Sequence, residues 1–153
     1  MTISNIKFDS DNKPTAAGKL RIGLYNKEAH WANDVQDKEK TLKSCKGTVT
    51  TVEKKAVVTY SGEIGAYPAI VVPSNAGSIT VTYKGVPPGQ YAISLFHDED
   101  NDGKMKKNWL GMPKEKYGFS RNFNPNSKLR APKFNECVFT VKEGNNAQQI
   151  NLR

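Results

Sequence analysis

Alternation of apolar and polar residues is the strongest pattern along the chain. It is clearest over residues 20–24 and 78–84, where aliphatic or aromatic side chains occupy every second position. A period of two is typical of a strand with one buried face. Further β-rich runs cover residues 3–8, 49–52, 56–60, 69–72, 91–96, 137–141 and 149–152. The pattern therefore predicts an all-β fold.

Seven to nine short, mainly antiparallel strands separated by turn residues favour a β-sandwich, immunoglobulin-like or prealbumin-like. The 153 residues fit one domain spanning residues 1–153. The breaker at residues 85–89 (GVPPG) ends one strand and starts the next, and we expect these two strands to be neighbours. Residues 34–44 are interpreted as a loop with one or two helical turns. Residues 104–133 lack alternation and are predicted to form a long irregular loop.

Composition excludes several classes of protein. The hydrophobic fraction of 37% is too high for a disordered chain, and no apolar run is long enough for a transmembrane segment. The first residues lack the basic and apolar regions of an export signal. We therefore expect either a cytosolic protein or an exported one whose signal has been removed.

Charge is concentrated in one part of the chain. The net charge is +8, and residues 104–133 alone hold nine bases and one acid. Four acids, Asp98, Glu99, Asp100 and Asp102, directly precede this basic segment. Adjacent blocks of opposite charge indicate a functional region.

The acidic block contains the pattern Asp-x-Asp-x-Asp-Gly, which suits a hard cation. Asp98, Asp100 and Asp102 would supply oxygen ligands to Ca²⁺, Gly103 would allow the sharp turn, and the backbone carbonyl of Lys104 is a natural fourth ligand. Two later positions of a complete calcium loop hold lysine and tryptophan, so we expect weak binding. The alternative is an acidic turn that caps its own backbone.

The basic segment also contains aromatic rings, and lysine, arginine and rings together suit an anionic partner such as an acidic lipid, a glycan or another polyanion. The alternative is that the rings close the core and the bases form a solvated face. No motif of sequence-specific nucleic-acid binding is present. The candidate ligand-binding residues are Lys106, Lys107, Trp109, Lys114, Lys116, Tyr117, Arg121, Lys128 and Arg130.

Signals of catalysis are weak. The two histidines, His30 and His97, are far apart in sequence, and no serine lies in a nucleophile motif. The two cysteines, Cys45 and Cys137, are too distant in sequence for a zinc knuckle and are either one disulfide or two buried thiols.

Several segments together resemble the DUF2141 family of bacterial proteins. They are residues 86–92 (VPPGQYA), 96–104 (FHDEDNDGK), 110–120 (LGMPKEKYGFS) and 131–134 (APKF), with an early strand at 18–26. The resemblance implies an exported, periplasmic or secreted β-sandwich whose signal has been removed. An oxidising compartment would permit a disulfide between Cys45 and Cys137. The family's Pro-Lys-Glu segment adds Glu115 as a further metal donor.

The chain departs from the family pattern in two places. Asp100 and Asp102 make the turn more acidic than usual, while Lys106 replaces an expected aspartate, and the later segment is unusually basic. We therefore expect a secreted, non-catalytic and monomeric binding module with an acidic, calcium-binding turn and a cationic, aromatic-rich face. The alternatives are a metal-assisted hydrolase that uses His97 and the acidic cluster, and a structural component of the cell envelope.

Overall fold

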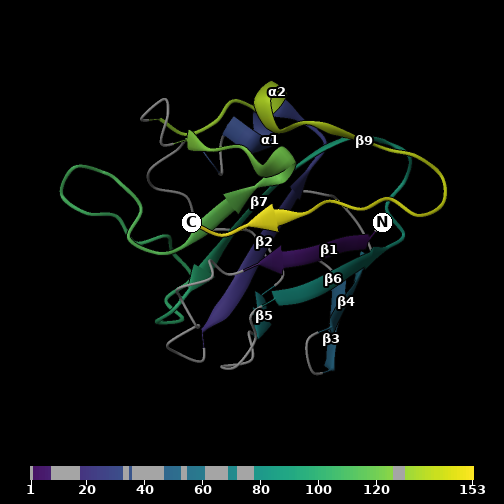
Figure 1. Ribbon diagram of the computed structural model, residues 1–153, viewed down its shortest axis with the longest axis horizontal. Helices are drawn as coiled ribbons and strands as arrows, with labels where there is room; N and C mark the ends of the chain where they lie inside the picture. The colour runs from purple at the N-terminus through teal and green to yellow at the C-terminus, as the bar shows by residue number, and fades with distance from the viewer. Residues whose placement is uncertain are drawn as a thin grey trace.

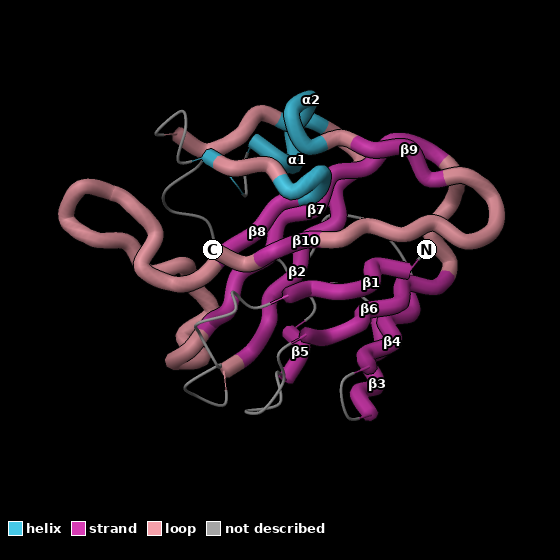
Figure 2. Tube along the Cα trace, viewed as in Figure 1, coloured by secondary structure: helices cyan, strands magenta, loops and turns pink. Residues whose placement is uncertain are grey.

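The computed structural model describes residues 2–7, 18–32, 35, 47–52, 55–60, 69–71, 78–125 and 130–153. Most of the regular structure is β-strand, and the helices are short (Figures 1 and 2). The strands are β1 (Thr2–Lys7), β2 (Lys19–Tyr25), β3 (Gly47–Val52), β4 (Lys55–Tyr60), β5 (Ala69–Val71), β6 (Ser78–Lys84), β7 (Gly89–Asp98), β8 (Tyr117–Phe119), β9 (Phe139–Val141) and β10 (Ile150–Asn151). The helices are α1 (Glu28–Trp31), the 3-10 turn η2 (Ser120–Asn122) and α2 (Phe134–Cys137). The predicted all-β class is confirmed.

The strands form two sheets. One has the order β10-β1-β6-β4-β3, and the other has the order β5-β2-β7-β8, with β9 added to β7. Pairing is antiparallel except between β1 and β10 and between β4 and β6. Tyr117 and Arg153 exchange backbone hydrogen bonds of 3.1 and 2.9 Å, so β8 is linked to the chain end that follows β10. A sandwich of seven to nine strands is not confirmed, because the described residues form ten strands whose sheets are joined at this edge.

The main core contains alternate residues of strands from both sheets. It contains Leu20, Ile22, Leu24, Ile79, Val81, Tyr83, Tyr91, Ile93, Leu95, Val141, Ile150 and Leu152. Every second side chain of β2 and β6 belongs to it, as the period of two predicts. The apolar surface removed from water in this cluster stabilises the pairing of the strands.

A second core covers the opposite face of β2 and β7. It contains Tyr25, Trp31, Ala92, Phe96, Tyr117, Phe119 and Cys137, with Phe134 packed against it. Figure 1 shows α1 and α2 together on this side of the sheet. The Nε1–H of Trp31 donates a 2.9 Å hydrogen bond to the carbonyl of Pro132, which ties α1 to the segment before α2. Both faces of β7 are therefore covered, and its residues from Tyr91 to Asp98 are all buried.

Three expectations are corrected by these contacts. Strands β6 and β7 are not hydrogen-bonded neighbours, because the turn between them carries the chain from one sheet to the other. Cys137 ends helix α2 and does not begin a strand. The predicted irregular loop at 104–133 contains β8 and η2. Of residues 34–44, only Val35 is described. None of the described helices is long and apolar enough to cross a membrane.

Candidate functional site

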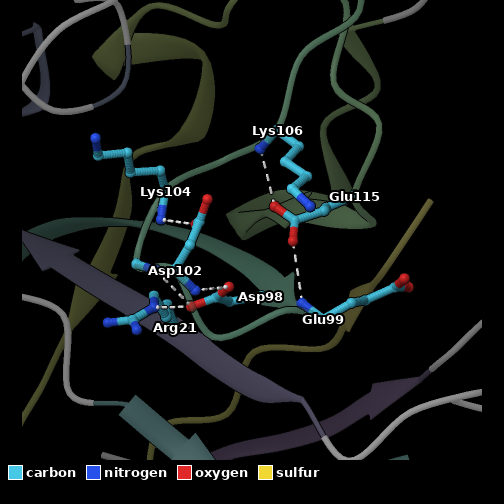
Figure 3. A network of polar contacts seen from close by, with 8 residues as sticks. Arg21, Asp98, Glu99, Asp102, Lys104, Lys106 and Glu115 are labelled. Carbon is cyan, nitrogen blue, oxygen red and sulfur yellow. Dashed lines mark hydrogen bonds and ion pairs between the residues drawn. The ribbon is translucent and has the colours of Figure 1, made fainter.

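A buried carboxylate at the end of β7 organises the acidic turn, residues 98–103 (Figure 3). Asp98 is 0% exposed, and its Oδ2 accepts a 2.5 Å hydrogen bond from Nε of Arg21 on β2. Its two oxygens also accept hydrogen bonds from the backbone N–H groups of Asp102 (3.1 Å) and Gly103 (3.0 Å). Gly103 has φ of +82°, a left-handed conformation that favours glycine. The turn is thus wrapped around a carboxylate whose charge is balanced by arginine.

Glu115 closes the site from the other side. It is 5% exposed, and its oxygens accept hydrogen bonds from the backbone N–H of Glu99 (3.0 Å) and of Lys106 (2.9 Å). Figure 3 shows Glu115 between these two donors. Burial raises the pKa of Glu115, and the two backbone hydrogen bonds oppose that shift. Glu115 is therefore a clamp between two segments, and both oxygens offered as metal ligands are already hydrogen-bonded.

The outer carboxylates of the turn also have partners. The ammonium of Lys106 lies 2.5 Å from Oδ2 of Asp100, and this hydrogen bond lowers the pKa of Asp100 and raises that of Lys106. Asp102 accepts a 2.7 Å hydrogen bond from the backbone N–H of Lys104. A lysine and an arginine therefore supply positive charge on two sides of the turn.

Asp98, Asp100 and Asp102 nevertheless converge as the sequence pattern predicts. Each offers one carboxylate oxygen, and these oxygens all lie within 4.8 Å of one another. Such a cluster can hold a metal ion. Glu115, a further expected ligand, is not part of this cluster of carboxylates, and a contribution from the backbone carbonyl of Lys104 stays a prediction.

His97 lies on β7 directly before the acidic turn and is 1% exposed. Its Nδ1 lies 3.7 Å from Oε1 of Glu99, and a Cβ atom at Gly18 would approach its Nε2 to 2.6 Å. Burial lowers the pKa of His97, and the nearby Glu99 opposes this effect. The imidazole is thus packed close to the backbone at Gly18 and favours its neutral form at neutral pH.

The segment beyond the turn, residues 104–114, is a hairpin that we call the arm. Its two sides are joined by hydrogen bonds from Lys114 N–H to the Lys106 carbonyl and from Asn108 N–H to the Met112 carbonyl, each 2.8 Å. At the tip, Asn108 Oδ1 accepts from the N–H groups of Leu110 and Met112, each at 3.0 Å. In Figure 1 this stretch, drawn in green, projects to the left of the sheets. The sequence interpretation missed the hairpin, although Asn at the first and Gly at the fourth turn position (108–111) is a signature of a type I turn.

The structure separates the candidate ligand-binding residues into groups. Lys106, Lys107, Trp109 and Lys114 are exposed on the arm, and Trp109 is 91% exposed. Tyr117 lies in the second core, and the Nζ atom of Lys116 is buried without a hydrogen-bond partner among the described residues. Arg121 is exposed in η2, and Arg130 is held by both oxygens of Glu136 at 2.9 Å. Lys128 lies outside the described residues.

The cysteine prediction remains open. Cys137 is a buried free cysteine, and burial together with the nearby Glu136 raises its pKa to about 12. Cys45 lies outside the described residues, so its pairing stays a prediction. Ser120, which is also buried, donates to the Cys137 carbonyl at 2.5 Å and accepts from Ile93 N–H at 2.9 Å. These contacts make Ser120 a link between β7 and α2.

Comparison with known proteins identifies one family. Residues 10–149, nearly the whole chain, match the family described as "Uncharacterized protein conserved in bacteria (DUF2141)". No curated protein and no solved structure matches the chain. The match includes β2, β7, the acidic turn and the arm, which are the elements that build the site. The chain therefore belongs to the DUF2141 family.

Proposed function

We propose that this protein is an exported, non-catalytic binding module, a single β-sandwich domain that presents the arm to an anionic partner. The observation that carries this proposal is the distribution of charge around the arm. Acidic side chains at its base are engaged by Arg21, Lys106 and backbone N–H groups. Lys104, Lys107 and Lys114 are exposed and form no ion pair with any described residue.

This separation of charge makes the arm cationic although the site as a whole contains many acids. No acidic residue lies within residues 104–114. Near an acidic membrane surface each lysine contributes about 1 kcal/mol, and binding to a polyanion gains from the release of counterions. Three exposed lysines on a hydrogen-bonded hairpin therefore support binding without a deep pocket.

The contacts of two other residues in the basic segment disfavour them as parts of the binding surface. Arg130 already has a bidentate carboxylate partner, and Tyr117 is part of the core. Burial of His97 also argues against the alternative of a metal-assisted hydrolase, because a general base must reach the substrate. We therefore assign the partner surface to the arm.

Reversing the charge of the arm is expected to abolish binding to anions. The test compares Lys104→Glu/Lys107→Glu/Lys114→Glu with Lys27→Glu/Lys84→Glu/Lys142→Glu, a control with the same change of net charge at exposed sites elsewhere. Binding to phosphatidylserine vesicles, heparin and an oligonucleotide is measured at low and high salt. We expect a loss of more than about a hundredfold in the arm variant, since each reversal removes and then opposes a favourable charge, and a small loss in the control. Equal losses, or no binding by the native protein, would contradict the proposal.

We further propose that the acidic turn binds Ca²⁺ weakly, in competition with Lys106. The support is the convergence of three carboxylates around a turn with glycine in the left-handed conformation. The cation must displace the Lys106 ammonium from Asp100, and Asp98 is already bound to Arg21. A dissociation constant of about 10⁻⁴ to 10⁻³ M, the range of weak extracellular sites, fits these constraints.

Removing the competing ammonium is expected to strengthen Ca²⁺ binding severalfold. Calorimetric titration compares Lys106→Gln with Lys107→Gln, a neighbouring exposed lysine outside the acidic cluster. Free Ca²⁺ at about ten times its dissociation constant should also stabilise the fold by about 1.4 kcal/mol through mass action. Asp100→Ala should abolish both effects. If Lys106→Gln and Lys107→Gln respond alike, or if Ca²⁺ leaves the melting temperature unchanged, the turn is only a structural cap.

A further inference from the structure

The tip of the arm carries two large hydrophobic side chains that are exposed. Trp109 is 91% exposed and Leu110, its neighbour, is 64% exposed. In the part of the chain whose side-chain exposure is described, the other large aliphatic and aromatic side chains are at least partly covered. Two adjacent apolar side chains at the end of a projecting hairpin have no role in the packing of either core.

The tip does not need these side chains to keep its shape. Its conformation rests on hydrogen bonds within residues 106–114 and on Gly111, which has φ of +78°. The Asn108 side chain completes the turn by accepting from two backbone N–H groups. Trp109 and Leu110 are therefore presented on an ordered support, and neither stabilises that support through packing.

The hydrogen bonds at the tip also make it suited to an environment without water. Three successive backbone N–H groups, those of Leu110, Gly111 and Met112, all have acceptors within the hairpin. In lipid an unsatisfied backbone group is costly, so an inserting loop must satisfy its own donors. The tip meets this condition at the N–H groups of Leu110, Gly111 and Met112.

Charge around the tip indicates the kind of surface that would cover it. Lys107 lies on the first side of the hairpin, close to Trp109, and Lys114 lies on the second side. Lys104 is nearer the base. Tryptophan is enriched at the level of lipid head groups, and lysine reaches phosphate while its stem lies on apolar surface. A glycan would use the ring of Trp109 but would gain little from the aliphatic Leu110.

We propose that Trp109 and Leu110 insert into the interface of an anionic lipid bilayer while the lysines of the arm contact its head groups. This inference rests on the proposed function and specifies its partner as a membrane surface. The acidic turn and Glu115 hold the base of the arm, so the tip enters the bilayer as a rigid unit. Binding would depend on both negative lipid charge and the apolar tip.

The chain contains two tryptophans, and only Trp109 is exposed, so fluorescence can report insertion. On vesicles of phosphatidylcholine and phosphatidylserine, we expect the Trp109 emission to shift to shorter wavelength, to lose quenching by iodide and to gain quenching by brominated lipid. Trp31→Phe isolates this signal. Because that variant also loses a buried hydrogen bond, flotation of Trp109→Ser/Leu110→Ser with vesicles provides a second measurement at exposed positions.

The double variant should lose about tenfold or more in vesicle partitioning, from the apolar area of the two side chains, and should keep its binding to heparin. If it partitions like the native protein while the arm charge reversal does not, insertion is wrong and the proposed function stands. If the native protein binds no anion, both fail. If the double variant instead changes only self-association in sedimentation velocity, the tip is a contact between copies of the chain and the inference is overturned.

Discussion

Asp98→Ala is expected to lower the free energy of unfolding by about 3–5 kcal/mol, the cost of removing one partner from a buried ion pair. The substitution leaves the part-buried guanidinium of Arg21 without its carboxylate and removes the acceptor of two backbone N–H groups. The turn should loosen first, so hydrogen exchange at Asp102 and Gly103 should accelerate. Urea denaturation measures the global effect.

Glu143→Ala provides the control for this substitution, because Glu143 is an exposed carboxylate outside the site. We expect it to change stability by less than about 0.5 kcal/mol. Asp98→Asn keeps the shape of the side chain and loses its charge. Its loss of unfolding free energy should lie between those of Asp98→Ala and Glu143→Ala. If Asp98→Ala were as stable as Glu143→Ala, the Arg21 pair would not organise the turn.

Trp31→Ala should destabilise the protein by about 3–5 kcal/mol, the range for truncating a large buried aromatic side chain. Trp31 is fully buried, and the centroid of its ring lies 5.3 Å from that of Tyr25. It also packs against the rings of Phe119 and Phe134. Its removal leaves a cavity in the second core. It also leaves the Pro132 carbonyl without the indole N–H that donates to it. Thermal and urea denaturation measure the loss.

Trp109→Ala is the matched control, since it truncates the same residue type at an exposed position. We expect it to alter stability by less than about 0.5 kcal/mol. Trp31→Phe retains a ring and loses the hydrogen bond, and should cost about 1–2 kcal/mol. Similar stability of Trp31→Ala and Trp109→Ala would mean that the second core does not hold α1 and α2 on the sheet.

The strands were predictable where burial of one face leaves a period of two. In β2 and β6 the apolar positions all enter the main core, so the pattern identifies both the element and its buried face. The short elements α1, α2 and β8 were not predicted. Three or four residues show too little periodicity, and their conformation depends on packing against rings from distant parts of the chain.

The candidate site was predicted only where its chemistry is local. Asp98, Asp100 and Asp102 lie within five residues, and the glycine that follows them permits the turn that brings them together. Arg21 carries no signal, because it is 77 residues from Asp98 and reaches it through the register of β2 against β7. Glu115 was recognised as important and assigned to a metal, whereas its oxygens bind the backbone N–H groups of Glu99 and Lys106.

Local residue patterns were thus sufficient for the all-β class, most strand positions, the acidic turn and the family. Long-range contacts decided which side chains are buried and which remain exposed to solvent. Tyr117 and Trp109 lie in the same basic segment, yet one is buried beside Phe119 and the other projects from the hairpin tip. The physical reason is that burial depends on which surfaces strand pairing brings together, and residues close in sequence then experience different environments.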